Sequence, residues 1–156
     1  MIELLVAIAI IGLLSTIILI SVDNARANGR DAFRKFSMKQ VESALEIYKH
    51  KNGSYPSTGG AWWGESVNGG SRSVSGINAY IPNLTPSYIL ELPRDPAFVT
   101  TAWSGFLYRS DGTNYKLLSH TSGPESFPST GQGFYDPIRP TWAWMICNSE
   151  PACSTW

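Results

Sequence analysis

The residues of this chain whose spacing most clearly predicts chemistry are its two cysteines, Cys147 and Cys153, in the run Cys-Asn-Ser-Glu-Pro-Ala-Cys. A zinc site would need four ligands, and neither a further cysteine nor a histidine stands nearby. The pair is typical of a short disulfide-closed loop outside the reducing cytoplasm, with two free thiols as the alternative. Such a loop constrains one end of a domain and does not stabilise its core.

Few other side chains are spaced for catalysis. The only histidines are His50 and His120, and we expect both at the surface. Asp111 and nearby oxygens could bind calcium, but an Asp-Gly turn explains this residue and the carboxylates do not cluster. The sequence shows no Gly-rich phosphate loop, nucleophile elbow or metal-ligand cluster. We therefore predict a protein that is not an enzyme and that has no catalytic residues, cofactor or metal.

Glu3 is the acidic residue whose position most needs an explanation. It stands directly before an apolar run from Leu4 to Val22 that contains no charge and approaches the ~20 residues of a bilayer-spanning helix. A carboxylate at such a border is costly unless it is paired. The free N-terminal amine of a neighbouring copy is the natural partner, and the alternative is a simple position in the lipid headgroup zone.

Three interpretations of the apolar run compete. A signal peptide cut after residues 25–27 would have a shorter apolar region, and no basic segment precedes this one. A single-pass anchor would place the basic residues that follow, and the rest of the chain, in the cytoplasm, in conflict with the cysteine pair. In the third, the run is one half of a longer helix, since helical periodicity continues without proline to about Lys51.

The predicted helix has an apolar half, residues 1–24, and an amphipathic half, residues 25–52, and it stops at Asn52-Gly53. At roughly 75 Å a helix of this length is longer than a small domain, so the apolar half must protrude. The predicted apolar stripe of the second half is Phe33, Phe36, Val41, Ala44, Leu45 and Tyr48, and the polar remainder is Arg30, Arg34, Lys35, Lys39, Glu42 and Glu46.

Residues 53–156 form the predicted globular head. A long Gly/Ser/Pro-rich connection over 53–94 is expected to contain one helical turn near Ala79-Tyr80. Residues 105–120 predict a β-hairpin with a tight primed turn at Asp111-Gly112, and residues 141–146 predict a third strand with both tryptophans on one face. The expected fold class is α+β, a small antiparallel sheet packed on the amphipathic half of the helix.

Residues 2–14, from Ile-Glu-Leu-Leu-Val to Gly12-Leu-Leu, resemble the N-terminal signature of type IV pilins and type II secretion pseudopilins. Residues 44–56 and 88–96 and the hairpin at Asp111-Gly112 also look like this family. The resemblance implies a pilin-like fold and a filament built by packing the N-terminal helices. It also implies that Glu3 neutralises a neighbour's amine, and that helical hydrogen bonds are lost near Gly12 in the filament.

The family resemblance further implies cleavage by a prepilin peptidase and methylation of the new N-terminal amine. Family members carry the Glu as the fifth mature residue, whereas here it is third and no basic leader precedes it. We expect Met1 to correspond to the third mature residue of a truncated sequence. The alternative is that this processing does not apply.

The predicted function is that of a structural, major subunit of a type IV pilus-like extracellular filament at the cell surface. The predicted partners are further copies of the chain, the inner membrane before assembly and the pilus assembly machinery. Balanced charge, with 12 basic and 12 acidic residues, gives no reason for an obligatory nucleic acid partner. The alternatives are a type II secretion pseudopilin and a membrane-anchored binding module, and the C-terminal cysteine loop favours a pilin.

Overall fold

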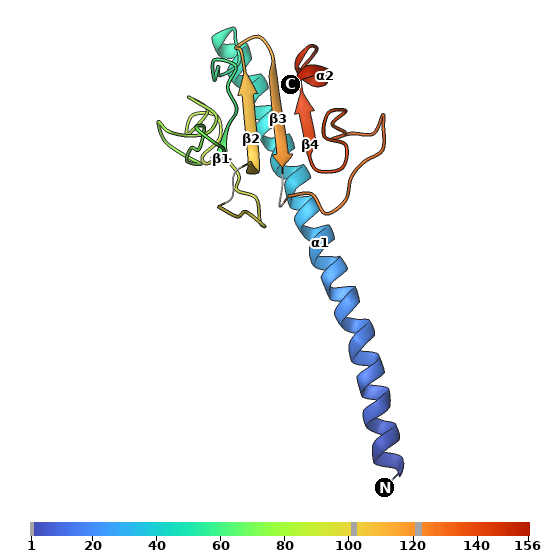
Figure 1. The fold of residues 1–156 in the computed structure, drawn as a ribbon. Coiled ribbons are helices and arrows are strands. Elements are labelled where there is room, and N and C mark those ends of the chain that lie inside the picture. The colour runs from blue at the N-terminus through green and yellow to red at the C-terminus, as the bar shows by residue number, and fades with distance from the viewer. Residues whose placement is uncertain (1, 101–102, 121–122) are drawn as a thin grey trace.

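The computed structural model describes residues 2–100, 103–120 and 123–156, without the side chains of residues 14–20. A long helix and a small antiparallel sheet form two layers, and the N-terminal half of the helix extends beyond the sheet (Figure 1). This is the predicted α+β, pilin-like arrangement. The elements are α1 (Ile2–Asn52), β1 (Trp63–Ser66), β2 (Ser104–Ser110), β3 (Tyr115–His120), β4 (Trp144–Cys147) and α2 (Ala152–Thr155).

Helix α1 ends where the sequence predicts. No proline precedes Pro56, so nothing in the sequence removes a helical hydrogen bond before that point. Gly53 has a positive φ of 82° and its N–H donates to the Lys49 carbonyl at 2.8 Å, while the Asn52 side chain donates to the Tyr48 carbonyl. A glycine in the left-handed region satisfies the last helical carbonyls and turns the chain toward the head.

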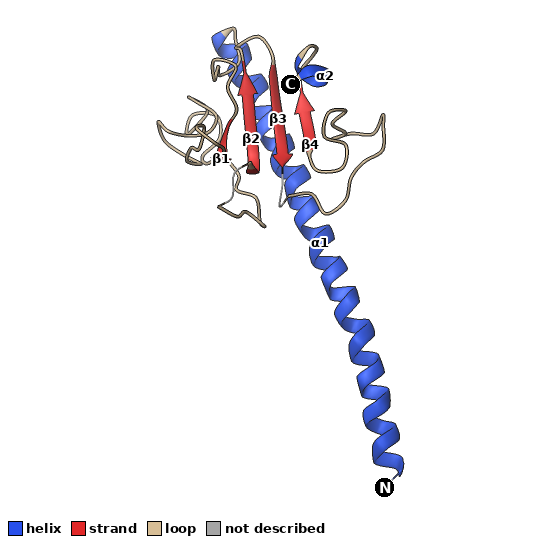
Figure 2. Ribbon diagram, viewed as in Figure 1, coloured by secondary structure: helices blue, strands red, loops and turns tan. Residues whose placement is uncertain are grey.

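The strand order is β1-β2-β3-β4 and all neighbouring pairs are antiparallel (Figure 2). The predicted β2–β3 hairpin is confirmed, but its tight primed turn is wrong, because Ser110 pairs with Tyr115 and four residues connect them. Asp111 Oδ1 accepts the backbone N–H groups of Thr113 and Asn114 at 2.8 and 2.7 Å. This carboxylate therefore shapes a longer loop than Asp-Gly alone indicated.

The connection over 53–94 differs from the prediction in two ways. It contains β1, which pairs with β2 and was not predicted. It has no helical turn at Ala79-Tyr80, where Ala79 instead forms a β-bridge with Ser73 and the Tyr80 N–H donates to the Ser73 carbonyl at 2.9 Å. Both residues are buried, so packing in the core decides their conformation over local propensity.

The predicted third strand exists as β4 but begins later than expected. Trp144 starts the strand and is buried, and its Nε1 donates to the Ser126 carbonyl at 2.8 Å. Trp142 lies before the strand and is exposed. The two tryptophans therefore do not share a face of the sheet, because only one of them follows the strand's alternation.

The buried stripe of α1 also differs from the prediction. Phe33 and Phe36 are 46% and 62% exposed, whereas Arg34, which was expected on the polar face, is fully buried. Positions 34, 38, 41 and 45 follow the helical repeat that faces the sheet, and the two phenylalanines fall beside it. The buried residues of the stripe are Asp31, Arg34, Ser37, Met38, Val41, Ala44 and Leu45.

Arg34 sits at the centre of a buried charge cluster. Its Nε and Nη2 donate to the two carboxylate oxygens of Asp95 at 2.8 and 3.0 Å, and its Nη1 donates to Asp31 at 2.9 Å. Asp31 in turn accepts the backbone N–H groups of Glu125 and Ser126. Burial alone would lower the pKa of Arg34, but the two carboxylates outweigh it and raise that pKa above its ordinary value. The cluster joins α1 to two separate loops of the head.

A second buried charge cluster lies on the other face of the sheet. Lys116 Nζ donates to Asp136 at 3.0 Å and to the main-chain oxygen of Trp156 at 2.8 Å, and Arg139 donates to both of the same residues. Lys116 and Leu117 are neighbours in β3, so their side chains point to opposite faces of the sheet. Leu117 packs in the core beneath α1, and Lys116 therefore faces away from the helix. The cluster holds the end of the chain against the sheet.

Cys147 at the end of β4 and Cys153 in α2 form a disulfide with their Cα atoms 5.4 Å apart. We predict that replacing both residues with serine lowers the free energy of unfolding by about 2 kcal/mol, as expected for so short a closed loop. The head should still fold, since its core lies elsewhere. Urea denaturation compares the variant with the wild type. Non-reducing mass analysis that found free thiols or an interchain bond in the wild type would contradict the pairing.

We predict a larger effect when Arg34 is replaced with methionine. The change leaves Asp31 and Asp95 buried without their cation, so the free energy of unfolding should fall by about 3–5 kcal/mol. Lys39→Met is the matched control, because Lys39 forms an exposed ion pair with Glu42 on the same helix and its loss should cost below about 1 kcal/mol. Equal denaturation midpoints for the two variants would show that the cluster does not stabilise the head.

Candidate functional site

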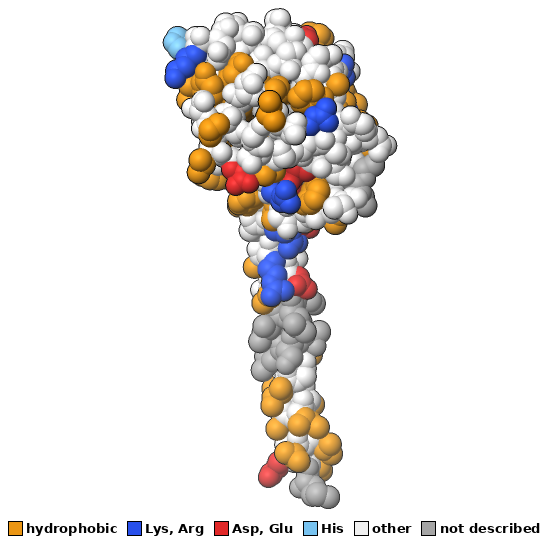
Figure 3. Space-filling model, turned by 90° about the vertical axis from the view of Figure 1, so that its left-hand side faces the viewer, with side chains coloured by type: hydrophobic (Ala, Val, Ile, Leu, Met, Phe, Trp, Pro, Cys, Tyr) orange, Lys and Arg blue, Asp and Glu red, His pale blue; other side chains and the backbone are white. Residues whose placement is uncertain are grey.

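The N-terminal part of α1 presents apolar side chains to its surroundings. Every described residue from 2 to 13 is exposed. Figure 3 shows hydrophobic side chains over this part, an acidic side chain at its tip, and further charges where the helix nears the head. We call residues 2–30 the stalk. An apolar surface of this kind needs cover by lipid or by another protein chain.

Glu3 lies in the first turn of α1 and is exposed. A negative charge at this end of a helix is favourable, because the helix dipole is positive there. The first described buried residue of α1 is Asp31, 28 positions along the helix or about 42 Å away. Glu3 is therefore placed to interact with lipid or another molecule and not with the head.

Gly12 lies within the continuous helix, and a Cβ added there would meet no atom within 4 Å. A side chain added at Gly12 would therefore meet open space. The side chains of residues 14–20, in the stretch after Gly12 where the family resemblance implies a loss of helical hydrogen bonds in the filament, lie outside the described part. No helix in the described part is long and apolar enough to cross a membrane, and residues 14–20 of the predicted apolar run are not described at side-chain level.

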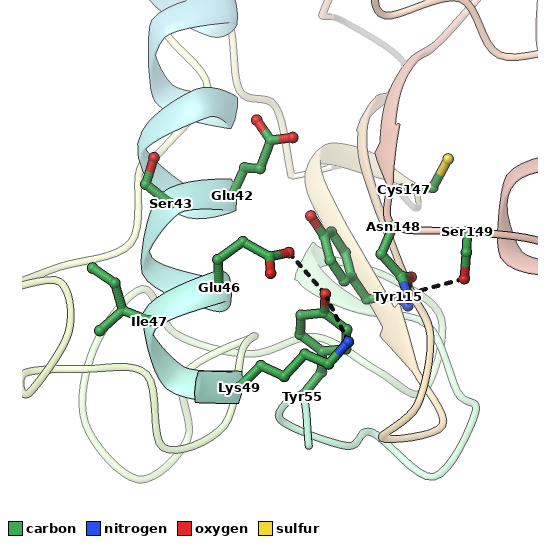
Figure 4. A pocket seen from close by; sticks show the side chains of 10 residues that line it. All are labelled: Glu42, Ser43, Glu46, Ile47, Lys49, Tyr55, Tyr115, Cys147, Asn148 and Ser149. Atoms are coloured by element: carbon green, nitrogen blue, oxygen red, sulfur yellow. Dashed lines mark hydrogen bonds between the residues drawn. The ribbon is translucent and has the colours of Figure 1, made fainter. Parts of the chain in front are cut away.

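A groove of about 790 Å³ lies between the last turns of α1 and the strand ends beside the disulfide (Figure 4). Glu42 and Glu46 line it from α1, and Tyr115 lines it from β3. The Tyr55 hydroxyl donates to Glu46 at 2.7 Å, and Lys49 lies over the Tyr55 ring. Burial and the Glu46 carboxylate raise the pKa of Tyr55, so it remains a hydrogen-bond donor at neutral pH. The groove is polar but contains no activated nucleophile.

The two histidines are not arranged as a catalytic pair. His50 is exposed on the last turn of α1, as predicted. His120 was expected at the surface but is buried, with Nδ1 2.6 Å from the Trp103 carbonyl and its ring against Trp142. Burial lowers the pKa of His120, so the ring is neutral at neutral pH. Among the described residues, no group of three His, Cys, Asp or Glu could hold a metal ion.

Glu65 is a further buried acid that the sequence did not indicate, besides Asp31, Asp95 and Asp136. Glu65 lies in β1, and burial raises its pKa to about 7. Arg94 Nε lies 2.8 Å from its Oε1, in an ion pair without hydrogen-bond geometry. A Cβ at Gly105 would stand 2.9 Å from the other carboxyl oxygen, so the backbone of β2 approaches this carboxyl group closely. The burial of Glu65 follows from its position in β1, and this strand was not predicted from the sequence.

Comparison with known proteins adds one informative match. No family model matches the chain, and no solved structure matches it. The chain is 28% identical over 144 residues to the type II secretion system core protein G of Pectobacterium carotovorum subsp. carotovorum, across 83% of this chain and 77% of that protein.

The match agrees with the geometry. It extends over most of the chain, so it includes head residues as well as helix residues. The structure has the long protruding helix and small antiparallel sheet that the N-terminal signature implied. Together these observations support the resemblance of the chain to type IV pilins and type II secretion pseudopilins.

Proposed function

We propose that this chain is a structural subunit, and not an enzyme, that polymerises through its N-terminal helix into a type IV pilus-like filament. The observation that carries the proposal is the contrast between the two ends of α1. Its C-terminal half is covered by the sheet, whereas its described residues up to 13 are exposed and almost all apolar.

Two environments can cover the stalk in turn. Before assembly, the inner membrane holds the apolar run, whose length suits a bilayer. In the filament, the stalks of neighbouring copies pack against one another, and the open surface at Gly12 allows close approach of a second helix. Glu3 then pairs with the processed N-terminal amine of a neighbour, because a charge entering an apolar bundle needs a partner.

Two candidate filaments fit this subunit. In the first, it is the major subunit of an extracellular pilus, which agrees with a disulfide-fastened C-terminal end. In the second, it is a pseudopilin of a secretion apparatus, which agrees with the similarity to a type II secretion core protein. Deleting the gene separates them: loss of sheared surface filaments supports the pilus, and retained filaments with loss of secreted proteins support the secretion role.

We predict that deleting residues 1–22 converts the protein into a soluble monomer with a folded head. The deletion removes the apolar surface and leaves the Arg34 cluster and the core intact. Sedimentation and circular dichroism give the oligomeric state and the fold. Filaments formed by the deleted chain would contradict polymerisation through the stalk.

We predict that Glu3→Ala shortens or abolishes filaments without unfolding the head. An unpaired amine in the helix bundle should cost about 3–5 kcal/mol at each junction, by analogy with broken buried ion pairs. Membrane-inserted subunits with an intact disulfide should accumulate. Electron microscopy of sheared material and membrane fractionation measure the two effects.

Asp23→Ala is the matched control for Glu3→Ala. Asp23 is an acidic residue of the same helix whose ion pair with Arg26 is long, at 3.7 Å, and largely exposed. Its removal should leave filament length unchanged, and Glu3→Asp should retain part of the assembly. If the Glu3→Ala chain formed wild-type filaments, the pairing of Glu3 with an amine would be wrong. Glu3 would then be a residue that lies in the lipid headgroup zone.

A further inference from the structure

The end of the head nearest the stalk carries both tryptophans that are more than a third exposed. Trp103 is 36% exposed just before β2, and Trp142 is 46% exposed just before β4. The His120 ring at the end of β3 lies between them, with centroids 6.3 Å from Trp103 and 4.9 Å from Trp142. The starts of β2 and β4 and the end of β3 all face the stalk (Figure 1). The other four tryptophans are buried or half-buried.

Two further apolar side chains belong to the same end. Val99 is 41% exposed, and its N–H donates to the Ser104 hydroxyl at the start of β2. Phe127 is 40% exposed and follows Ser126, whose N–H and hydroxyl bind Asp31 of α1. We call these four residues, Val99, Trp103, Phe127 and Trp142, the stalk-side rim.

The chain around the rim is poor in charge. Residues 96–108, 126–135 and 140–149 contain no Lys, Arg, Asp or Glu. Glu125, which lies beside the rim, is held by Arg30 at 2.6 Å. The opposite end of the head carries Lys49, Lys51 and Asp111. Two cations approach the rim, since Arg139 lies over the Trp142 ring at 5.8 Å and Lys35 lines a pocket together with Phe127. A surface with exposed tryptophans and few charges suits the boundary between lipid tails and headgroups, because the indole ring is apolar and its N–H is polar.

The position of the rim along α1 is compatible with that boundary. The apolar run ends at Val22, and the loop that carries Phe127 binds the helix at Arg30 and Asp31. Eight residues of helix correspond to about 12 Å. The headgroup layer is roughly 5–8 Å thick on each side of the bilayer, and spanning helices tilt by about 20°. The rim lies to one side of the helix axis, on the side of the sheet, so a helix tilted toward its sheet lowers the rim further and brings it toward the headgroup layer (Figure 1).

We propose that the stalk-side rim rests in the lipid headgroup layer of the membrane that holds the subunit before assembly. The inference rests on the proposed function, which requires the stalk to be inserted in that membrane. The partner is a lipid surface, and the contact is made by aromatic and aliphatic side chains, so it is insensitive to salt. It fixes the tilt of the head on the membrane and is broken when the subunit leaves for the filament.

Depth-dependent fluorescence quenching tests the proposal on the full chain in vesicles of phosphatidylcholine and phosphatidylglycerol. Lipids brominated near the headgroup end of the tail should quench part of the tryptophan emission, and lipids brominated at the tail end should quench less. The quenching should be lost in the double variant Trp103→Phe, Trp142→Phe and should be unchanged by high salt. The circular dichroism spectrum of the variant checks that it is folded.

The matched control is the double variant Trp62→Phe, Trp63→Phe. Trp63 pairs with Tyr108 in the half of β2 that is remote from the stalk, so this variant should keep the quenching. Flotation of the vesicles separates the two possible failures. If the chain floats with the vesicles but its emission is not quenched, the rim contact alone is overturned. The same holds if the Trp103→Phe, Trp142→Phe variant is quenched as much as the wild type. A chain that does not float overturns the membrane stage of the proposed function and the rim contact with it.

A different occupant of the rim gives a different result. If the rim binds a second copy of the chain, the emission of Trp103 and Trp142 should shift to the blue with protein concentration in vesicles without bromine. Shallow bromine should then leave it unquenched. That combination would overturn the lipid contact in favour of a subunit interface.

Discussion

The buried charge cluster around Arg34 is the interaction on which the rest of the structure depends. A guanidinium group without solvent is very costly, and here Asp95 and Asp31 both reach it and offset that cost. Asp31 also binds the backbone beside Ser126. The helix and two loops distant in sequence are therefore held in one relative position. The cluster also marks where burial of the helix begins, because every described residue before Asp31 is exposed or half-buried.

The two ends of the molecule therefore differ in how well their apolar side chains are covered. The head encloses its core, and its outer sheet face is closed by Lys116 and Asp136. The stalk offers its apolar side chains no cover from its own chain within the described part. In the proposed function, membrane and filament both supply that cover, so a subunit passes from one to the other without repacking its head. Similarity to a type II secretion system core protein agrees with this division of roles.

The sequence predicted the elements that depend on local signals. The helix end at Gly53, the β2–β3 hairpin and the burial of Val41 and Leu45 follow from turn residues and periodicity. It failed where tertiary contacts reversed a residue's usual preference. Arg34 was assigned to solvent because it is charged, and Phe33 to the core because it is apolar. Neither the buried partner Asp95 nor the unpredicted strand β1 could be inferred without the three-dimensional arrangement.

The stalk raises a problem that apolar burial alone does not solve. Hydrophobic contacts are non-directional, so helices that meet only through aliphatic side chains can slide along one another at little cost. Glu3 is the one charged residue between Ile2 and Val22. If its partner is a single amine on the neighbouring subunit, only one axial position satisfies both charges, and every shifted position leaves them unpaired in an apolar bundle. In the proposed filament, the aliphatic run therefore supplies the association, and Glu3 sets the spacing between subunits.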